Sequence, residues 1–104
     1  MAPFFSRDFR AVFSRLNQRI RSFEDEIVML RDEQYRRENH LDGLLSRPNS
    51  EEQVVLLLQQ NDENSRQIIT LQERISQMRR RVEELNLKHQ VALCREEHQR
   101  IYGR

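Results

Sequence analysis

Cys94 and His98 are the two residues whose types and spacing come nearest to a chemical site. Because they are four positions apart, a helix presents the thiol and the imidazole on one face, which is half of a zinc site. Structural zinc needs four ligands. Only His89, on a different face, and carboxylates such as Glu97 lie nearby. We therefore expect no metal and no cofactor, and interpret Cys94 as a small apolar residue.

Adjacent carboxylates are the other candidates for chemistry, and they occur at Glu83-Glu84 and Glu96-Glu97. Neighbouring side chains on a helix point apart, so these pairs do not converge on one substrate atom. The sequence has no glycine-rich phosphate loop and no nucleophile with a matching base. These features predict a protein that is not an enzyme and has no small-molecule substrate.

Arginine clusters at 36–37 and 79–81 are candidates for phosphate contacts. A basic-zipper DNA reader needs a basic helix leading directly into its leucine seam. Here the residues before the second apolar seam are Ser50, Glu51 and Glu52, which have the wrong charge. An Arg-rich nucleic-acid-associated factor stays as an alternative, but the pattern favours ion pairs between these arginines and acids beside the helix–helix seam.

The composition is typical of long helices. Of 104 residues, 34 % are charged and 37 % hydrophobic, with only two Gly and two Pro. The net charge of +1 is unevenly spread: residues 1–23 carry +4, residues 24–52 carry −5 and residues 53–104 carry +2. An acidic middle between basic ends favours folding back or staggered pairing over diffuse binding to a polyanion.

Two heptad repeats predict two amphipathic helices, over residues 1–45 and 51–102, with a loop at 46–50. The predicted helix–helix seam is made of apolar residues at the a and d positions. In the first segment these are Phe9, Phe13, Leu16, Ile20, Phe23, Ile27, Leu30, Leu41 and Leu44. In the second they are Val54, Leu57, Ile68, Leu71, Ile75, Met78, Val82 and Leu85.

The break between the helices contains residues that typically end one helix and start the next. Gly43 weakens the last turn of the first helix, and Pro48 lies in the loop. Ser50 is predicted to cap the second helix, with Gln53 completing a capping box.

Pairing the two segments antiparallel around the loop places every a position of one segment opposite a d position of the other. The pairs run from Leu44 with Val54 to Phe13 with Leu85, and the two residue numbers of each pair sum to 98. The same alignment places the two polar breaks of the seams opposite one another and puts Phe9 opposite His89. This polar register layer comprises Gln34, Arg37, Asn61 and Asn64. Matched polar positions define a register, because a misaligned buried amide loses its partner.

The predicted fold class is therefore all-α, an antiparallel coiled-coil helical hairpin that forms one structural unit. A parallel dimer stays open as the alternative, because Asn61 at a, among Ile and Val at a and Leu at d, also suits two parallel strands.

Apolar residues outside the seam exceed what a two-helix hairpin needs. The candidate partner surface comprises Val55, Leu56, Leu58 and Ile69, and a stripe near the C-terminus made of Leu87, Val91, Cys94 and Ile101. Phe4 and Phe5 are a second candidate. Helices that are apolar beyond one stripe are usually covered by further elements. We expect association into a dimer or four-helix bundle, or docking on partner helices.

The function that these features predict is a scaffold or adaptor subunit of a larger assembly, for example a cytoskeletal one. Its expected partners are itself, as a homo-oligomer, or another coiled-coil protein, with nucleic acid and membrane disfavoured. The single Cys94 and the lack of a long apolar run favour the cytoplasm. A mitochondrial or membrane-surface protein using its basic N-terminal helix stays as an alternative. The sequence names neither the partner nor the process.

Overall fold

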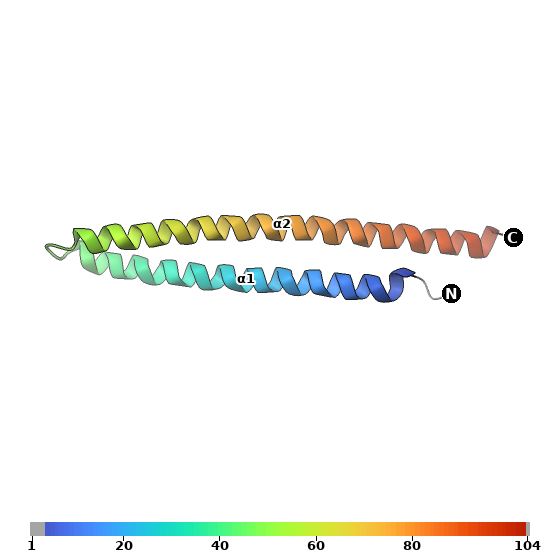
Figure 1. Ribbon diagram of the computed structural model, residues 1–104, viewed down its shortest axis with the longest axis horizontal. Helices are drawn as coiled ribbons and strands as arrows, with labels where there is room; N and C mark the ends of the chain where they lie inside the picture. Colours follow the sequence, from blue (N-terminus) through green and yellow to red (C-terminus); the bar gives the residue numbers. More distant parts are fainter. Residues whose placement is uncertain (1–3, 104) are drawn as a thin grey trace. The chain divides into compact units, whose positions relative to one another are not determined.

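The computed structural model describes residues 4–103, and their side chains from residue 9 onward. Two α-helices account for nearly all of them: α1 spans Phe4–Leu45 and α2 spans Glu51–Tyr102. Figure 1 shows the chain reversing direction at the loop between them. Long runs of Arg, Glu, Gln and Leu without proline form such helices readily. The predicted all-α class and the helical hairpin are confirmed, and no strand occurs within residues 4–103.

The loop between the helices is tight. Asn49 adopts a left-handed conformation with φ 63°, which asparagine tolerates better than most residues. The amide of Arg47 donates to the carbonyl of Leu44 at 3.0 Å, and the hydroxyl of Ser46 donates to the carbonyl of Gly43 at 2.9 Å. Gly43 itself remains helical, so α1 ends two residues later, at Leu45.

Ser50 directly precedes α2, and its carbonyl accepts the first helical hydrogen bond from the amide of Val54 at 3.0 Å. Its hydroxyl lies 2.7 Å from the carbonyl of Leu44 and 2.9 Å from that of Arg47, and donates to them. The side chain thus bonds to carbonyls of the last turn of α1 and of the loop, whereas we had expected it to form a capping box within α2. Glu51 and Glu52 do lie in the first turn of α2, where negative charge is favourable.

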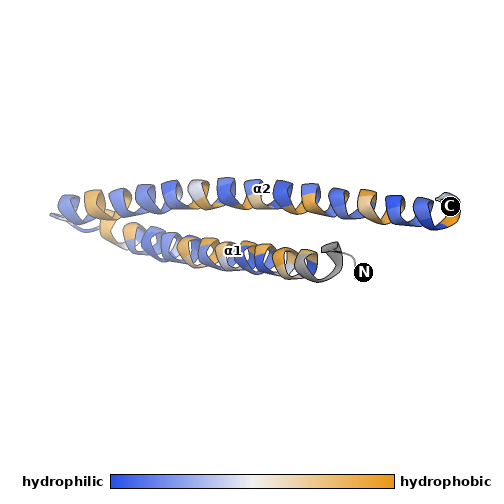
Figure 2. Cartoon of the chain, turned by 45° about the vertical axis from the view of Figure 1, so that its right-hand side comes forward, coloured by the Kyte–Doolittle hydropathy of each residue, from blue (hydrophilic) through white to orange (hydrophobic). Residues whose placement is uncertain are grey.

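By its contacts the chain divides into two compact units. One is residues 22–74, and the other combines residues 1–21 with residues 75–104. Figure 2 shows hydrophobic residues recurring along both helices between hydrophilic ones.

The core of the 22–74 unit consists of a and d side chains. Its buried apolar members are Ile27, Leu30, Leu41, Leu44, Ile68 and Leu71, and its half-buried ones are Phe23, Val54 and Leu57. Each antiparallel helix thus turns one apolar stripe toward the other.

The unit of residues 1–21 and 75–104 uses the same positions with less complete burial. Ile20 and Ile75 are buried, and Phe9, Phe13, Leu16, Met78, Val82 and Leu85 are half-buried. Near the start of α1 the rings of Phe9 and His89 stack with centroids 4.3 Å apart and planes 6° apart. These are the two residues that the pairing rule places opposite each other. Beyond Ala92 every α2 side chain up to Tyr102 is exposed.

Candidate functional site

The candidate partner surface of the 22–74 unit is open to solvent. Val55, Leu56, Leu58 and Ile69 are each 50–55 % exposed. The end of α1 shows the contrast most sharply, since Leu44 is 3 % exposed and the next residue, Leu45, is 69 % exposed. The hairpin therefore closes its own seam without using these side chains.

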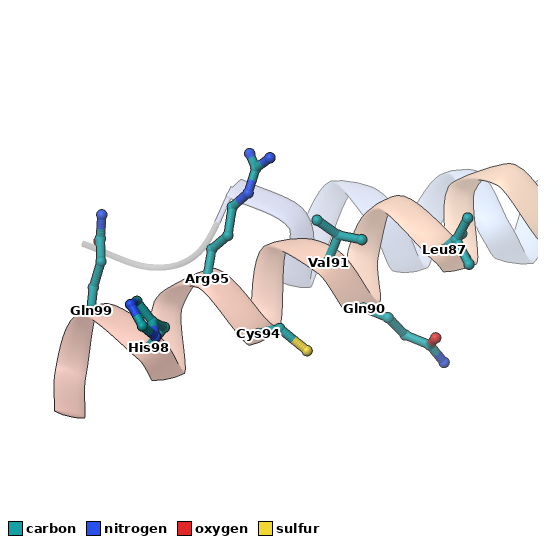
Figure 3. Close-up of a pocket in the computed structure, with 7 residues that line it drawn as sticks. All are labelled: Leu87, Gln90, Val91, Cys94, Arg95, His98 and Gln99. Carbon is teal, nitrogen blue, oxygen red and sulfur yellow. The ribbon is translucent and has the colours of Figure 1, made fainter. Parts of the chain in front are cut away.

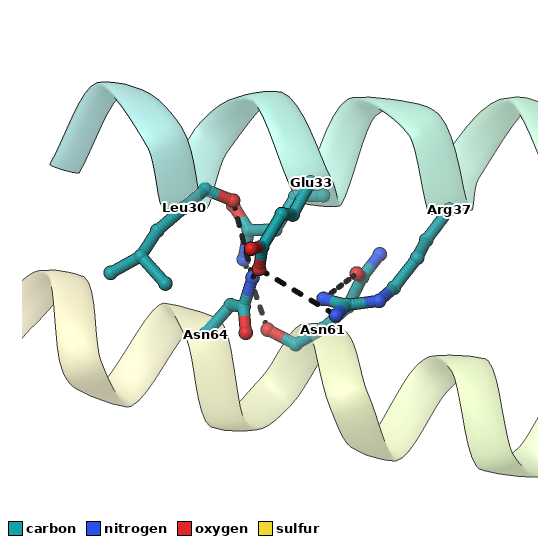
Figure 4. Close-up of polar contacts among 6 residues, drawn as sticks. Leu30, Glu33, Arg37, Asn61 and Asn64 are labelled. Carbon is teal, nitrogen blue, oxygen red and sulfur yellow. Dashed lines mark hydrogen bonds and ion pairs between the residues drawn. The ribbon is translucent and has the colours of Figure 1, made fainter. Parts of the chain in front are cut away.

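The predicted polar register layer is assembled within this unit, and Figure 4 shows Arg37, Asn61 and Asn64 between the two helices. Asn64 is buried at 6 % exposure, and its Nδ2 donates to the carbonyl of Leu30 at 3.2 Å and to Oε2 of Glu33 at 3.0 Å. Arg37 lies 3.6 Å from the same Glu33 oxygen, and its Nη1 donates to Oδ1 of Asn61 at 3.4 Å. One connected network thus links α1 to α2.

The partners of Gln34 differ from the residue-by-residue alignment. That alignment places Gln34 against Asn64, but Nε2 of Gln34 donates to the carbonyl of Asn61 at 2.9 Å and to the hydroxyl of Ser65 at 2.8 Å. Asn64 instead turns toward Leu30 and Glu33. Both amides remain satisfied, but each bonds to the residue next to its aligned partner and to one about a turn away, because a side chain bonds where its length and rotamer carry it.

Glu33 and Ser65 are the functional members of this layer that sequence reasoning missed. Both flank the seam and are outside its a and d positions. A signal was present, because Glu33 lies four residues before Arg37, the spacing of a helical ion pair.

The C-terminal stripe forms one face of α2. Figure 3 shows Leu87, Val91, Cys94 and His98 on this stretch, where with Gln90, Arg95 and Gln99 they line one open depression. Leu87 is 65 % exposed and Ile101, further along, is 58 % exposed. This end of α2 therefore carries apolar side chains that no described part of α1 covers.

The residues considered for metal binding, Cys94 and His98, lie on the exposed end of α2. No group of three or more His, Cys, Asp or Glu side chains that could hold a metal occurs there. The imidazole of His98 lies against the ring of Tyr102, with centroids 4.9 Å apart, and Cys94 is an exposed free thiol.

The two arginine clusters differ in their surroundings. Arg36 pairs with Asp32 at 2.8 Å, and Arg37 belongs to the polar layer. Arg80 and Arg81 are exposed. The first cluster is therefore engaged within the chain, whereas Arg80 and Arg81 of the second offer charge to the solvent.

None of the described helices is long and apolar enough to cross a bilayer. The side chains of Phe4 and Phe5, our second candidate surface, lie outside the residues whose side chains the structure describes. Comparison with protein-family models, with curated proteins and with solved structures finds no match to this chain.

Proposed function

We propose that this chain is a non-enzymatic scaffold or adaptor subunit, a coiled-coil hairpin that binds other helices through its exposed apolar side chains. The observation that carries the proposal is the half-exposed set Val55, Leu56, Leu58 and Ile69 beside a seam that is already closed. Fully burying an exposed apolar side chain contributes about 1.5–3 kcal/mol, so covering one that is already half-buried contributes roughly half of that. A partner helix that covers several of them gains enough to bind.

The coiled-coil part of the proposal rests on spacing. Apolar residues repeat at 3.5-residue intervals along both helices, and burial follows the a and d positions. The polar network around Asn64 supports a register role, as buried polar residues have in other helical assemblies. A fixed register gives the helix-binding surface of the 22–74 unit a defined position.

A scaffold needs surface rather than a cleft, and the exposed positions supply it at two separate places. One is around Leu58 in the 22–74 unit, and the other is the depression lined by Leu87 and Val91. The exposed thiol of Cys94 fits a reducing compartment, so the cytoplasm is the proposed location.

Site-specific photo-cross-linking of the full chain in its native source tests this proposal. A photoreactive phenylalanine analogue replaces Leu58, and a matched control replaces its exposed polar neighbour Gln59. The expected result is that position 58 forms a cross-link to a helical segment of another polypeptide. Position 59 should form little or none of this adduct. Equal labelling at the two positions, or adducts to nucleic acid only, would overturn the proposal.

A second candidate function is binding to a nucleic acid, favoured by the charge of one unit. Residues 1–21 and 75–104 together hold twelve bases and five acids, a net charge of +7. Binding of RNA or DNA at several salt concentrations tests this candidate, because phosphate binding falls steeply as salt rises. Tight RNA or DNA binding that is lost with a steep salt slope would favour this second function.

A further inference from the structure

The two units of the chain carry opposite charge. Residues 22–74 hold twelve acids and six bases, a net charge of −6, whereas residues 1–21 with 75–104 carry +7. Charges of opposite sign on different patches of one protein attract between copies and steer their orientation. The nearly neutral chain is thus made of two strongly charged halves.

An acidic face runs along the b and e positions of the 22–74 unit. Of its four acids, Glu24 is half-buried, whereas Glu38, Asp42 and Asp62 are exposed, and no hydrogen bond or ion pair joins these three to another described residue. On a helix, b and e positions alternate at spacings of three and four and form one stripe. The exposed apolar residues on the same stripes are Val28, Tyr35, Leu45, Val55, Leu58 and Ile69. Arg31 is the one base among them.

A basic face runs along the c and g positions of the other unit. Its exposed bases are Arg15, Arg19, Arg81, Lys88 and Arg95, with Glu84 as the one acid among the side chains that the structure describes. Val12 and Val91, 40 % and 46 % exposed, lie on the same stripes. Figure 3 shows Val91 and Arg95 projecting to the same side of α2.

We infer that the acidic face of this chain binds the basic face of a second copy, so that each copy offers both halves of one repeated contact. This inference rests on the proposed helix-binding function and names its partner. Pairing like with like places Asp62 and Glu38 beside acids of the other copy, which repels. Pairing an acidic face with a basic face brings opposite charges together around the apolar side chains of both surfaces. Partial desolvation strengthens the attraction between these charges.

Charge reversal on each face supplies the test. The first variant is Glu38→Lys with Asp62→Lys, and the second is Lys88→Glu with Arg95→Glu. The matched control for the first variant, Asp25→Lys with Glu73→Lys, makes the same change in net charge as that variant at f positions, which are farthest from the seam. Association of the purified full-length chain is measured by sedimentation from micromolar to submillimolar concentration, at low and high salt, with helix content followed by circular dichroism.

The wild type should self-associate, and more weakly at high salt, because the screening length falls from about 10 Å at 0.1 M to about 3 Å at 1 M. Each face variant alone should raise the dissociation constant by about tenfold or more, since attraction becomes repulsion. The control should stay within about threefold of the wild type. Mixing the two face variants should restore association, because each reversed face then meets its complement.

Three results would overturn the inference: a monomeric wild type, an equal loss in the control, or a mixture of variants that stays as weak as either alone. Loss of helix content in one variant leaves the salt dependence of the wild type as the deciding measurement. A different protein captured at position 58, together with a monomeric wild type, would remove the second copy as the partner and leave the helix-binding function standing.

Discussion

The buried side chain of Asn64 on α2 donates a hydrogen bond to the main-chain carbonyl of Leu30 on α1, at 3.2 Å. A side chain that bonds to a backbone group of the opposite helix depends on the stagger of the helices. Its second amide hydrogen goes to Glu33, whose carboxylate also attracts Arg37. A slip of either helix by one turn breaks several of these bonds together.

Replacing Asn64 with Leu should loosen the stagger of the hairpin, although it adds apolar surface. The carboxylate of Glu33 loses a donor, while shifted registers no longer leave an amide unsatisfied. Spin labels at positions 26 and 74, which line one depression of the 22–74 unit, report the register in a Cys94→Ser background. The expected result is a broader distance distribution in Asn64→Leu than in the parent. An unchanged distribution would show that the seam alone sets the register.

Leu44 and Leu45 offer a matched test of the seam. Leu44→Ala should lower the free energy of unfolding by about 2–5 kcal/mol, because it removes a buried side chain from the core. Leu45→Ala should change it by no more than about 0.5 kcal/mol. Urea unfolding at low protein concentration measures both values. Similar losses in the two variants would mean that Leu45 is covered under the conditions of the measurement.

The stack of Phe9 on His89 should hold the start of α1 against α2. Phe9→Ala and His89→Ala should each weaken this end, with a coupling energy of about 0.5–1.5 kcal/mol in a double-mutant cycle. Hydrogen exchange locates the effect: amides near residues 9–16 and 85–92 should exchange faster, while those near the loop keep their protection. Additive effects in the cycle would show that the rings do not interact in solution.

Asn49 should be sensitive to the kind of residue that replaces it, because its φ of 63° disfavours a Cβ without compensating hydrogen bonding. Asn49→Ala should destabilise the hairpin by about 1–2 kcal/mol. Asn49→Gly should be tolerated better, since glycine adopts this conformation without steric cost. Thermal unfolding compares the two. A Gly variant that is less stable than the Ala variant would contradict a left-handed turn.

Leu56→Lys with Leu58→Lys should weaken association by about tenfold or more, because charged side chains replace apolar ones that a partner would bury. Helix content should persist, since both positions lie outside the seam. Sedimentation and circular dichroism measure the two quantities. Gln59→Lys with Gln60→Lys adds the same charge at neighbouring exposed positions and should leave association nearly unchanged. A monomer before and after the substitution would remove the claim of association.

Heptad spacing by itself determined that this chain forms two amphipathic helices with a break near Pro48, and it favoured a hairpin over a parallel dimer. Helix formation and amphipathic pairing depend on periodicity and on the placement of breakers, and both are local properties of a sequence. The same spacing placed Ile27, Leu30 and Ile68 on inward stripes, where the structure buries them. Charge counts alone also identified the acidic middle and the basic ends.

Only the tertiary structure decided which groups bond. The sequence aligned Gln34 with Asn64, but the fold turned Gln34 toward Ser65 and Asn64 toward Glu33. It also turned the hydroxyl of Ser50 back to the end of α1. A heptad repeat specifies which residues share a layer. The rotamers, the reach of each side chain and the positions of main-chain carbonyls on the opposite helix, which exist only once the helices have packed, select the partners.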